Sequence, residues 1–358
     1  MNQKIRRIVV FVLKLGVASG LLAWLITSGQ LRFSDLARAF RTGSLMLVAT
    51  FLIYNVCVFL TASRWRMLLV AQGLEAGRLE CLRMAYIGCF FSSLLPGGTG
   101  GDVVKAYYVA RDRHKKAEAV TTVVLDRVFG LYCMLGFASV ALLARFDHLW
   151  NYPGEAGPSG LTPTQMIAVG VLGAFIVATI AVVALLSKGC RRLVHWLADH
   201  LPGRLGDVLR RMYEAFYLYR SHHWLLVKFV VYSASAHALL TGGIWLLGLA
   251  LGDPLALGGS RALNYLFIIP VGLILNGLPI APAGIGVFEW ALGLLFASVL
   301  APGEANLGPT VAALGHIVIL LTNQIGLVFY LLARQRLADL APQPPGLSAQ
   351  EPAPDATP

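Results

Sequence analysis

The amino-acid sequence predicts an all-α polytopic membrane protein, with about six full spans and two re-entrant broken-helix hairpins in an inverted-topology repeat. Composition is the first observation behind this prediction: of 358 residues, 57% are hydrophobic and 13% are charged, and the mean hydropathy is +0.70. The second is a series of apolar runs of about 20 residues, the length that crosses a bilayer as a helix. The third is a pair of breaks rich in glycine and proline inside apolar sequence, because non-helical backbone is tolerated in a membrane only where protein buries it or water reaches it.

The formal net charge of +11 does not indicate nucleic-acid binding. Basic residues beside apolar spans set the topology and meet anionic lipid headgroups. The cysteines show no CxxC pairing, which argues against a disulfide framework or a metal site, and no cofactor is expected. They are Cys57, Cys81, Cys89, Cys133 and Cys190.

The first spans are assigned from apolar runs and their basic flanks. Ile8 to Ser28 follows a basic N-terminus and is too long for a signal-peptide core, so it is expected to be an uncleaved span that runs outward. Residues 30–43 have the pattern of an amphipathic helix on the outer surface. Ser44 to Ser63 returns to a cytoplasmic flank, Arg64-Trp65-Arg66.

The next apolar stretch, Met84 to Leu95, is too short to span a membrane. Basic residues precede it and follow it, so the chain is expected to enter from the cytoplasm and leave on the same side. We interpret it as re-entrant hairpin 1. The flanking basic residues are Arg78, Arg83, Lys105, Arg111, Arg113, Lys115 and Lys116.

The second half follows the same order from the opposite side of the membrane. Residues 119–144 form an outward span that closes the first half, and 165–186 return. The segment Lys188 to Lys228 is basic and is expected to form amphipathic helices at the cytoplasmic headgroup level, before an outward span at 224–251. Re-entrant hairpin 2 comprises residues 263–278 and 288–300 and enters from outside. The last span is residues 311–333.

This order defines one integral membrane domain, residues 1–340, with repeat 1 at about 8–145 and repeat 2 at about 165–335. The segment 341–358 is rich in proline and polar residues and is predicted to be a disordered tail. Most of the 29 lysines and arginines then lie on one side. This distribution predicts an inner-membrane protein with both termini in the cytoplasm.

The two breaks are the candidate substrate-binding site. In transporters built from inverted repeats, paired broken helices point to a binding site near the midplane, where half-helix N-termini favour an anionic group such as phosphate. The alternative is that the glycines only permit close helix packing. The candidate residues of the first break are Pro96, Gly97, Gly98, Gly100, Gly101, Asp102 and Lys105. Those of the second are Asn276, Pro279, Pro282, Gly284, Gly286 and Glu289.

The two acids that follow the breaks have more than one interpretation. Asp102 either caps its helix or contributes to the site. Glu289 lies further into an apolar half-helix, where capping is less natural and an intramembrane acid indicates a proton or amine site.

Asp126 and Arg127 are adjacent on a predicted span and project in different directions. We expect Arg127 to meet Asp102, Glu289 or a substrate phosphate, and Asp126 to meet Lys105, with a purely structural ion pair as the alternative. Other polar residues on spans are expected to form interhelical hydrogen bonds. They are His237, Asn276, His316, Asn323 and Gln324.

No enzyme motif is present: the sequence has no GxSxG elbow, no HExxH and no P-loop. The protein is therefore not expected to be an enzyme, and it is not expected to hydrolyse ATP itself.

Three motifs together resemble a known family. They are Pro96-Gly97-Gly98-Thr99-Gly100-Gly101-Asp102, Asp126-Arg127, and Pro279-x-x-Pro282-Ala283-Gly284-Ile285-Gly286-x-x-Glu289. Over residues 5–335 the chain resembles the flippase-like transmembrane region of lysylphosphatidylglycerol synthases, which also occurs in stand-alone membrane proteins, including a member associated with hopanoid biosynthesis. It departs from the pattern at Lys105, often arginine in the family, and at Asp126, often glutamate.

The resemblance implies movement of a phospholipid, a lipid-linked saccharide or a hopanoid between leaflets. No soluble aminoacyl-transferase domain follows the last span, so lysyl-lipid synthesis is not implied. A second hypothesis is a scaffold that presents lipid to a separate glycosyltransferase or lipid-biosynthesis enzyme, with residues 188–228 as its docking face. A third is a membrane-embedded transferase that uses Asp102 or Glu289.

Overall fold

The computed structural model describes residues 16, 19–29, 31, 33–94, 100–111, 116–151, 160–257, 263–277, 281, 284–299 and 307–339. This part of the chain folds into helices and contains no strand. The prediction of an all-helical membrane protein is therefore confirmed. The tail at 341–358 and most of the predicted first span lie outside the described residues, although residues 19–27 are helical.

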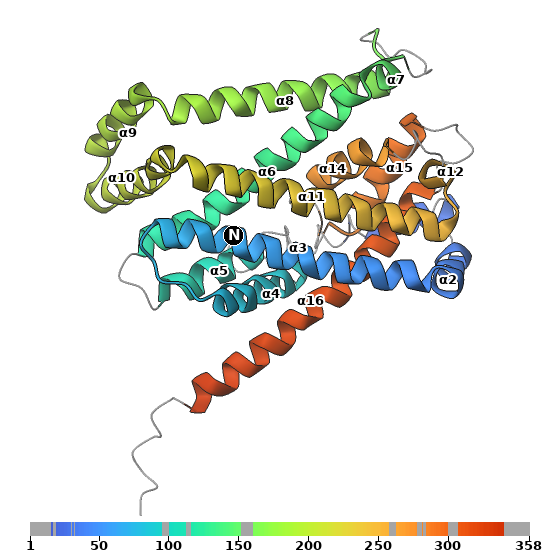
Figure 1. Cartoon of the computed structure of the whole chain (residues 1–358), viewed down its shortest axis with the longest axis horizontal. Coiled ribbons are helices and arrows are strands. Elements are labelled where there is room, and N and C mark those ends of the chain that lie inside the picture. Colours follow the sequence, from blue (N-terminus) through green and yellow to red (C-terminus); the bar gives the residue numbers. More distant parts are fainter. Residues whose placement is uncertain are drawn as a thin grey trace, which may run out of the picture.

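In the described part of the chain, five helices are long and apolar enough to cross a membrane. They correspond to the predicted spans that follow the first one, and they run along the long axis of the molecule, with α6 and α16 oblique to the others (Figure 1). Their outward faces are apolar, as a lipid environment requires; Leu45 is 81% exposed and Val177 is 66% exposed. The helices are α3 (Ser44–Ala71), α6 (Lys116–Ala144), α8 (Pro163–Leu185), α11 (His223–Leu251) and α16 (Leu307–Asp339).

Four shorter helices lie on either side of the two predicted breaks. They are α4 (Arg78–Leu94), α5 (Gly100–Arg111), α14 (Tyr265–Asn276) and α15 (Val287–Val299). Their lengths are 17, 12, 12 and 13 residues, so each is shorter than the about 20 residues that a helix needs to cross a membrane. α4 packs against α5 and α14 packs against α15, so each break lies within a pair of short helices.

Shorter helices lie at the two ends of the bundle. α2 (Phe33–Thr42), α7 (Phe146–Trp150) and α12 (Pro254–Leu257) gather at one end, and α9 (Lys188–His200) and α10 (Gly203–Tyr217) lie at the other (Figure 1). A short 3₁₀ helix, η1 (Leu218–Ser221), connects α10 to α11. The amphipathic segments predicted at 30–43 and within 188–228 are therefore helical. All five cysteines lie in the described part of the chain, and they form no disulfide.

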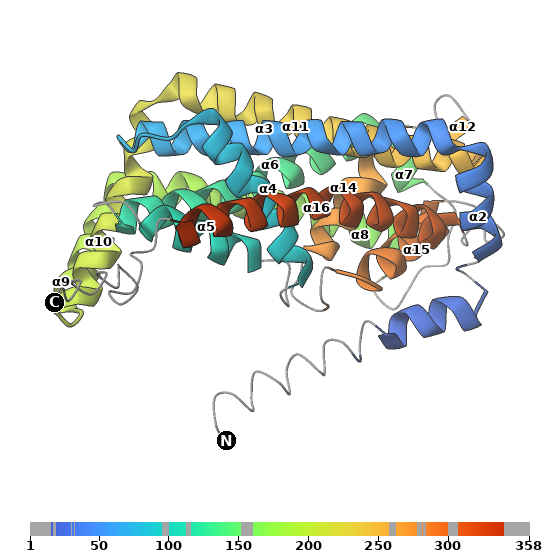
Figure 2. The same ribbon diagram turned by 90° about the horizontal axis from the view of Figure 1, so that it is seen from below.

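The most extensive contact between helices in the described structure is that between α3 and α11, which lie side by side in both views (Figure 2). Small and polar residues bring these two helices close together. Thr50 Oγ1 donates to the carbonyl of Gly243 at 2.9 Å, and Cys57 Sγ donates to the carbonyl of Ala236 at 3.4 Å. The largest apolar cluster is formed mainly by α6, α14, α15 and α16, and α11 adds Ile244 and Leu247.

The helix contacts fall into two matching sets. α5 packs on α6 as α15 packs on α16, α4 packs on α16 as α14 packs on α6, and α3 packs on α4 as α11 packs on α14. The contact between α3 and α11 joins the two sets. Exchanging the two halves of the chain therefore reproduces the same pattern of neighbours.

The predicted second span was wrong at its C-terminal end. We placed that end at Ser63 because Arg64 and Arg66 were interpreted as a cytoplasmic flank, but α3 continues without interruption to Ala71. The reason is that Arg64 is only 6% exposed: it is buried by partners on other helices, which a count of charged residues along the sequence cannot reveal.

Candidate functional site

An acid in the first turn of α5 bonds to an arginine on α6. Arg127 Nε donates to Oδ2 of Asp102 across 2.6 Å, and the two side chains are 46% and 24% exposed, respectively. Asp102 is the third residue of α5, where the helix dipole favours a negative charge. Asp102 is one of the partners that we expected for Arg127. Because the pair is open, another anion has access to the guanidinium.

A second cation, Lys105, lies one turn after Asp102 on α5. The ammonium of Lys105 is 5.4 Å from the centroid of the Trp65 ring, a cation–π contact between α5 and α3. The Cys89 thiol, on α4, lies within electrostatic range of Lys105, Arg127 and Asp102. Two cations and one acid therefore gather where α3, α4, α5 and α6 meet, and their sum is one positive charge. Such a group suits an anionic ligand.

The acid that follows the second break bonds to a histidine on α16. Oε1 of Glu289 lies 2.6 Å from Nδ1 of His316, and the two residues are 2% and 5% exposed. The other carboxylate oxygen accepts the backbone N–H of Gly286 at 2.8 Å, which is half of a capping box at the start of α15. Glu289 therefore caps its helix, which we had considered the less natural role, and it also holds an ionisable partner. That partner is His316 and not Arg127.

The two acid–base pairs occupy equivalent places in the two halves of the chain. Each acid is the third residue of the helix that follows a break, and each base lies on the next long helix, 25 residues on in the first half and 27 in the second. The pairs differ in two respects. Asp102–Arg127 is open and has a guanidinium as its base, which is always charged, whereas Glu289–His316 is closed and has an imidazole, which can be neutral or protonated.

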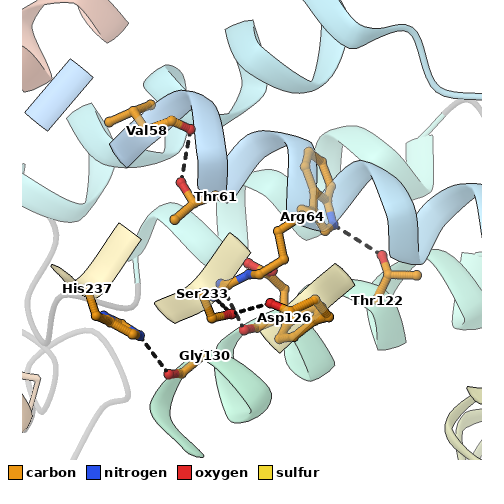
Figure 3. Close-up of polar contacts among 10 residues, drawn as sticks. Val58, Thr61, Arg64, Thr122, Asp126, Gly130, Ser233 and His237 are labelled. Atoms are coloured by element: carbon orange, nitrogen blue, oxygen red, sulfur yellow. Dashed lines mark hydrogen bonds and ion pairs between the residues drawn. The ribbon is translucent and has the colours of Figure 1, made fainter. Parts of the chain in front are cut away.

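Asp126 does not meet Lys105, contrary to our expectation. Its Oδ1 accepts a hydrogen bond from Arg64 Nε at 2.8 Å, and its backbone carbonyl accepts one from Arg64 Nη2 at 3.2 Å. Arg64 Nη1 donates to Ser233 Oγ at 3.0 Å, and the guanidinium lies 4.7 Å from the centroid of the Phe229 ring. Figure 3 shows Arg64 enclosed by α3, α6 and α11. This pair is the structural ion pair that we held as the alternative.

Sequence reasoning missed Arg64 because the residue was assigned to a loop. The available signal was that Asp126 needed a buried cation and that few arginines lie inside apolar sequence. His237, in contrast, follows the expectation of an interhelical hydrogen bond: its Nε2 lies 3.3 Å from the carbonyl oxygen of Gly130 (Figure 3). Asn323 does the same by donating to Ser93 Oγ at 2.6 Å.

The first break combines close packing with polar capping. A Cβ atom on Gly101 would lie 1.9 Å from the carbonyl oxygen of Gly88, so α4 and α5 touch at this point. Its backbone N–H donates to Ser92 Oγ at 3.1 Å. Gly100 is buried. Close packing, our alternative explanation for the glycines, therefore applies to Gly101. Pro96, Gly97 and Gly98 lie outside the described residues.

The second break depends on backbone conformations that favour glycine. Gly284 and Gly286 have φ angles of 75° and 83°, in the left-handed region that side chains disfavour. A Cβ atom on Gly284 would also lie 1.7 Å from Oδ1 of Asn276. That oxygen is buried and has no hydrogen-bond partner within the described part of the chain. Pro279 and Pro282 lie outside the described residues.

The chain matches one family model, described as the lysylphosphatidylglycerol synthase TM region, over residues 11–335. This match agrees with the resemblance inferred from the motifs, apart from the association with hopanoids, to which it does not extend. No curated protein and no solved structure matches the chain.

Proposed function

The chain belongs to the lysylphosphatidylglycerol synthase TM region family, and from this premise we propose that it is a lipid flippase. In this proposal the protein moves a lipid with a phosphate-bearing headgroup between the two leaflets and catalyses no covalent reaction. The observation that carries the proposal is the open Asp102–Arg127 pair at the start of α5, with Lys105 one turn away.

The arrangement of helices supports a transporter. The two matching sets of contacts are those expected of an inverted-topology repeat, with α4–α5 and α14–α15 as its two re-entrant hairpins. In secondary transporters, broken helices in corresponding positions of two repeats form the binding site near the midplane, and alternating access comes from rocking one repeat against the other.

The exposure of the pair supports exchange of its anion. An exposed ion pair contributes only about 0–1 kcal/mol, because solvent competes for both charges. A lipid phosphate can therefore replace Asp102 on Arg127 at little cost and gain charge-assisted hydrogen bonds from the guanidinium and from Lys105. The buried Arg64–Asp126 pair cannot exchange in this way, because separating a buried pair costs about 3–5 kcal/mol.

An apolar groove offers a place for the lipid tail. It has a volume of about 580 Å³, opens on the outer face between α3 and α11, and is lined by residues that include Ile53, Leu239 and Trp245. Tyr54, next to Ile53 in α3, lies within electrostatic range of Arg127. A headgroup at Arg127 and a tail in this groove are therefore compatible with one lipid.

The test of the proposal is leaflet exchange in vesicles that contain the purified protein. A fluorescent phosphatidylglycerol is followed by its access to an impermeant quencher. Arg127→Gln is expected to lower the exchange rate by about tenfold or more, since a hydrogen bond to a charged group is worth about 1.5–3 kcal/mol. The matched control is Arg38→Gln on α2, where another exposed Arg–Asp pair is 65% and 26% exposed. Exchange at the wild-type rate in Arg127→Gln would refute the proposal.

The predicted topology has its own test, because both termini and the α9–α10 end are proposed to be cytoplasmic at an inner membrane. Single cysteines at positions 80 and 113 are expected to react with an impermeant reagent only from the cytoplasmic side. Those at 257 and 305 are expected to react only from outside. Reaction of 80 and 113 from opposite sides would make α4 and α5 parts of a full crossing and would remove the inverted repeat.

A second candidate function is a subunit that presents lipid to a separate glycosyltransferase or lipid-biosynthesis enzyme. The α9–α10 hairpin favours it, because Trp196 and Leu205 on this hairpin are 56% and 63% exposed and the same helices carry several arginines. In the exchange assay, this function predicts no activity of the purified protein by itself. A lipid-modifying enzyme would then depend on both the hairpin and Arg127.

A further inference from the structure

The buried pair Glu289–His316 has an unused bonding position. Nδ1 of His316 lies 2.6 Å from the carboxylate, and the carboxylate is also held by the N–H of Gly286. Nε2 of His316 is buried and has no hydrogen-bond partner within the described part of the chain. A buried polar atom without a partner is unusual and calls for an explanation. Here that atom is the second nitrogen of an imidazole, which binds a proton.

Apolar side chains surround the pair in the part of the chain that the structure describes. Beside His316, the Phe288 ring lies edge-on at 5.4 Å between ring centroids, and α11 presents Ile244 and Leu247 at the neighbouring Gly315. α8 carries no titratable residue, and the charged residues of α2 lie at the end of the bundle (Figure 1). In the membrane-embedded parts of the other facing helices, none of the titratable groups bonds to the pair in the described structure. They are Tyr54, Cys57 and Arg64 on α3, Tyr86 and Cys89 on α4, Tyr232 and His237 on α11 and Tyr265 on α14.

We propose that Glu289 and His316 form a proton-binding site that couples lipid movement to a proton gradient. One proton from water on one side of the membrane adds to the Nε2 lone pair and converts the imidazole to an imidazolium beside the carboxylate. It leaves to water on the other side when the site opens there. No other bond changes. This inference rests on the proposed flippase function and names its source of energy.

The bases at the two equivalent positions also support a proton site in the second half. The equivalent pair in the first half has arginine, which stays charged under all physiological conditions and so suits a lipid phosphate. The second half has histidine, whose second ring nitrogen is buried without a partner in the described part of the chain and can bind a proton. In a repeat whose halves move together, a change of charge in one half biases the equilibrium in the other. Two equivalent positions thus hold the two ligands of a coupled transporter.

The opposing interpretation is that the pair only anchors α15 to α16. Glu289→Gln separates the two, because the amide oxygen still accepts the N–H of Gly286 while the charge is lost. His316→Gln keeps a hydrogen-bonding side chain but removes the imidazole that would bind the proton. An anchoring role predicts no change in the response to a proton gradient from either variant, once the amount of folded protein is matched.

The experiment measures the steady-state distribution of a fluorescent phosphatidylglycerol in vesicles with a gradient of about one pH unit. This gradient is a tenfold ratio of proton concentrations, so transport of one proton per lipid moves the leaflet ratio from one toward about ten. Wild type is expected to show this shift, a matching change in a luminal pH dye and the collapse of both with a protonophore. In Glu289→Gln and His316→Gln the ratio is expected to stay at one. Arg38→Gln is the control and should behave as wild type.

The possible outcomes separate the two proposals. Wild-type exchange with a leaflet ratio of one under the gradient would overturn proton coupling and leave the flippase function intact. A wild-type response in Glu289→Gln or His316→Gln would overturn the assignment of the site. Absence of exchange in wild type would overturn both proposals. If the two variants do not fold, the wild-type ratio and Glu289→Asp, which keeps a carboxylate and should retain part of the shift, still decide the question.

Discussion

The buried ion pair between Arg64 and Asp126 should be the most costly polar contact to break in this protein. The perturbation is Asp126→Asn, which keeps the shape of the side chain and the backbone carbonyl that Arg64 Nη2 contacts. It removes the charge opposite Nε. The two side chains of the pair are only 7% and 11% exposed, so water cannot replace the lost partner.

The expected magnitude follows from this burial. Breaking a buried ion pair by removing one member costs about 3–5 kcal/mol, because the remaining charge is left without compensation. We expect Asp126→Asn and Arg64→Met each to lower the free energy of unfolding by about this amount. The double variant leaves no lone charge, so its loss should be smaller than the sum of the single losses by about 3 kcal/mol or more.

A matched control lies one residue along α6. Arg127 and Asp102 form the same type of bond through Nε, but these side chains are 46% and 24% exposed. The cycle of Arg127→Gln and Asp102→Asn should therefore give a coupling of about 0–1 kcal/mol. The assay is reversible unfolding of the detergent-solubilised protein, followed by tryptophan fluorescence, for both cycles under the same conditions.

Comparing the coupling energies of the two double-mutant cycles tests whether burial controls the strength of these ion pairs. If the coupling of Arg64 with Asp126 is no larger than that of Arg127 with Asp102, burial does not control the strength of these pairs. The low cost of replacing Asp102 on Arg127 by another anion would then be refuted. The two cycles should also differ in function, since the exposed pair is expected to affect lipid exchange far more than unfolding.

Three further predictions concern the breaks and the α9–α10 hairpin. Gly101→Ala should destabilise the protein by about 1–3 kcal/mol, because its Cβ would lie 1.9 Å from a carbonyl oxygen of α4. Gly170→Ala is the control and should leave the stability unchanged, because no atom lies within 4 Å of its Cβ. Equal melting temperatures for the two variants would contradict this prediction. Gly284→Ala should lose lipid exchange, and adding Asn276→Ala should restore it only in part, because φ remains at 75°; full recovery would show that the clash alone matters. For Glu214, burial raises the carboxyl pKa, but its arginine and histidine partners lower it more, so the folded pKa is below its ordinary value. Its stabilising contribution is then full above the unfolded pKa and is lost as the pH falls below about 4.3, so hydrogen exchange in α9 and α10 should rise there in wild type but not in Glu214→Gln.

The sequence predicted the positions of the helices well, because hydrophobic length and helix-breaking residues are local properties. The predicted spans at 119–144, 165–186 and 224–251 lie close to α6, α8 and α11: 144 and 251 are also the ends of α6 and α11, and the other ends differ by one to three residues. The two breaks lie where proline and glycine interrupt apolar sequence. The wrong end at Ser63 shows the limit of this reasoning, since one charged residue was enough to end a span that continues to Ala71.

The pairing of charged residues could be predicted only in part. Asp102 was one of three partners proposed for Arg127, and their contact required only that α5 pack against the next helix. The partner proposed for Asp126 was wrong because Arg64 comes from a helix distant in sequence, 62 residues away. His316 was expected only to form an interhelical hydrogen bond, and its partner Glu289, 27 residues away, was not named. Spacing along the chain contains no information about which residues of separate helices reach the same depth.

The sequence by itself therefore determined that this protein is a helical membrane protein, where its chain breaks, and to which family it belongs. Only the tertiary structure decided which charges are buried and which remain open. The physical reason is that hydropathy and helix propensity depend on neighbours along the chain, whereas the environment of a charge depends on the residues packed around it. Arg64 and Arg127 have the same side chain, and packing alone makes one a structural ion pair and leaves the other accessible to an anion.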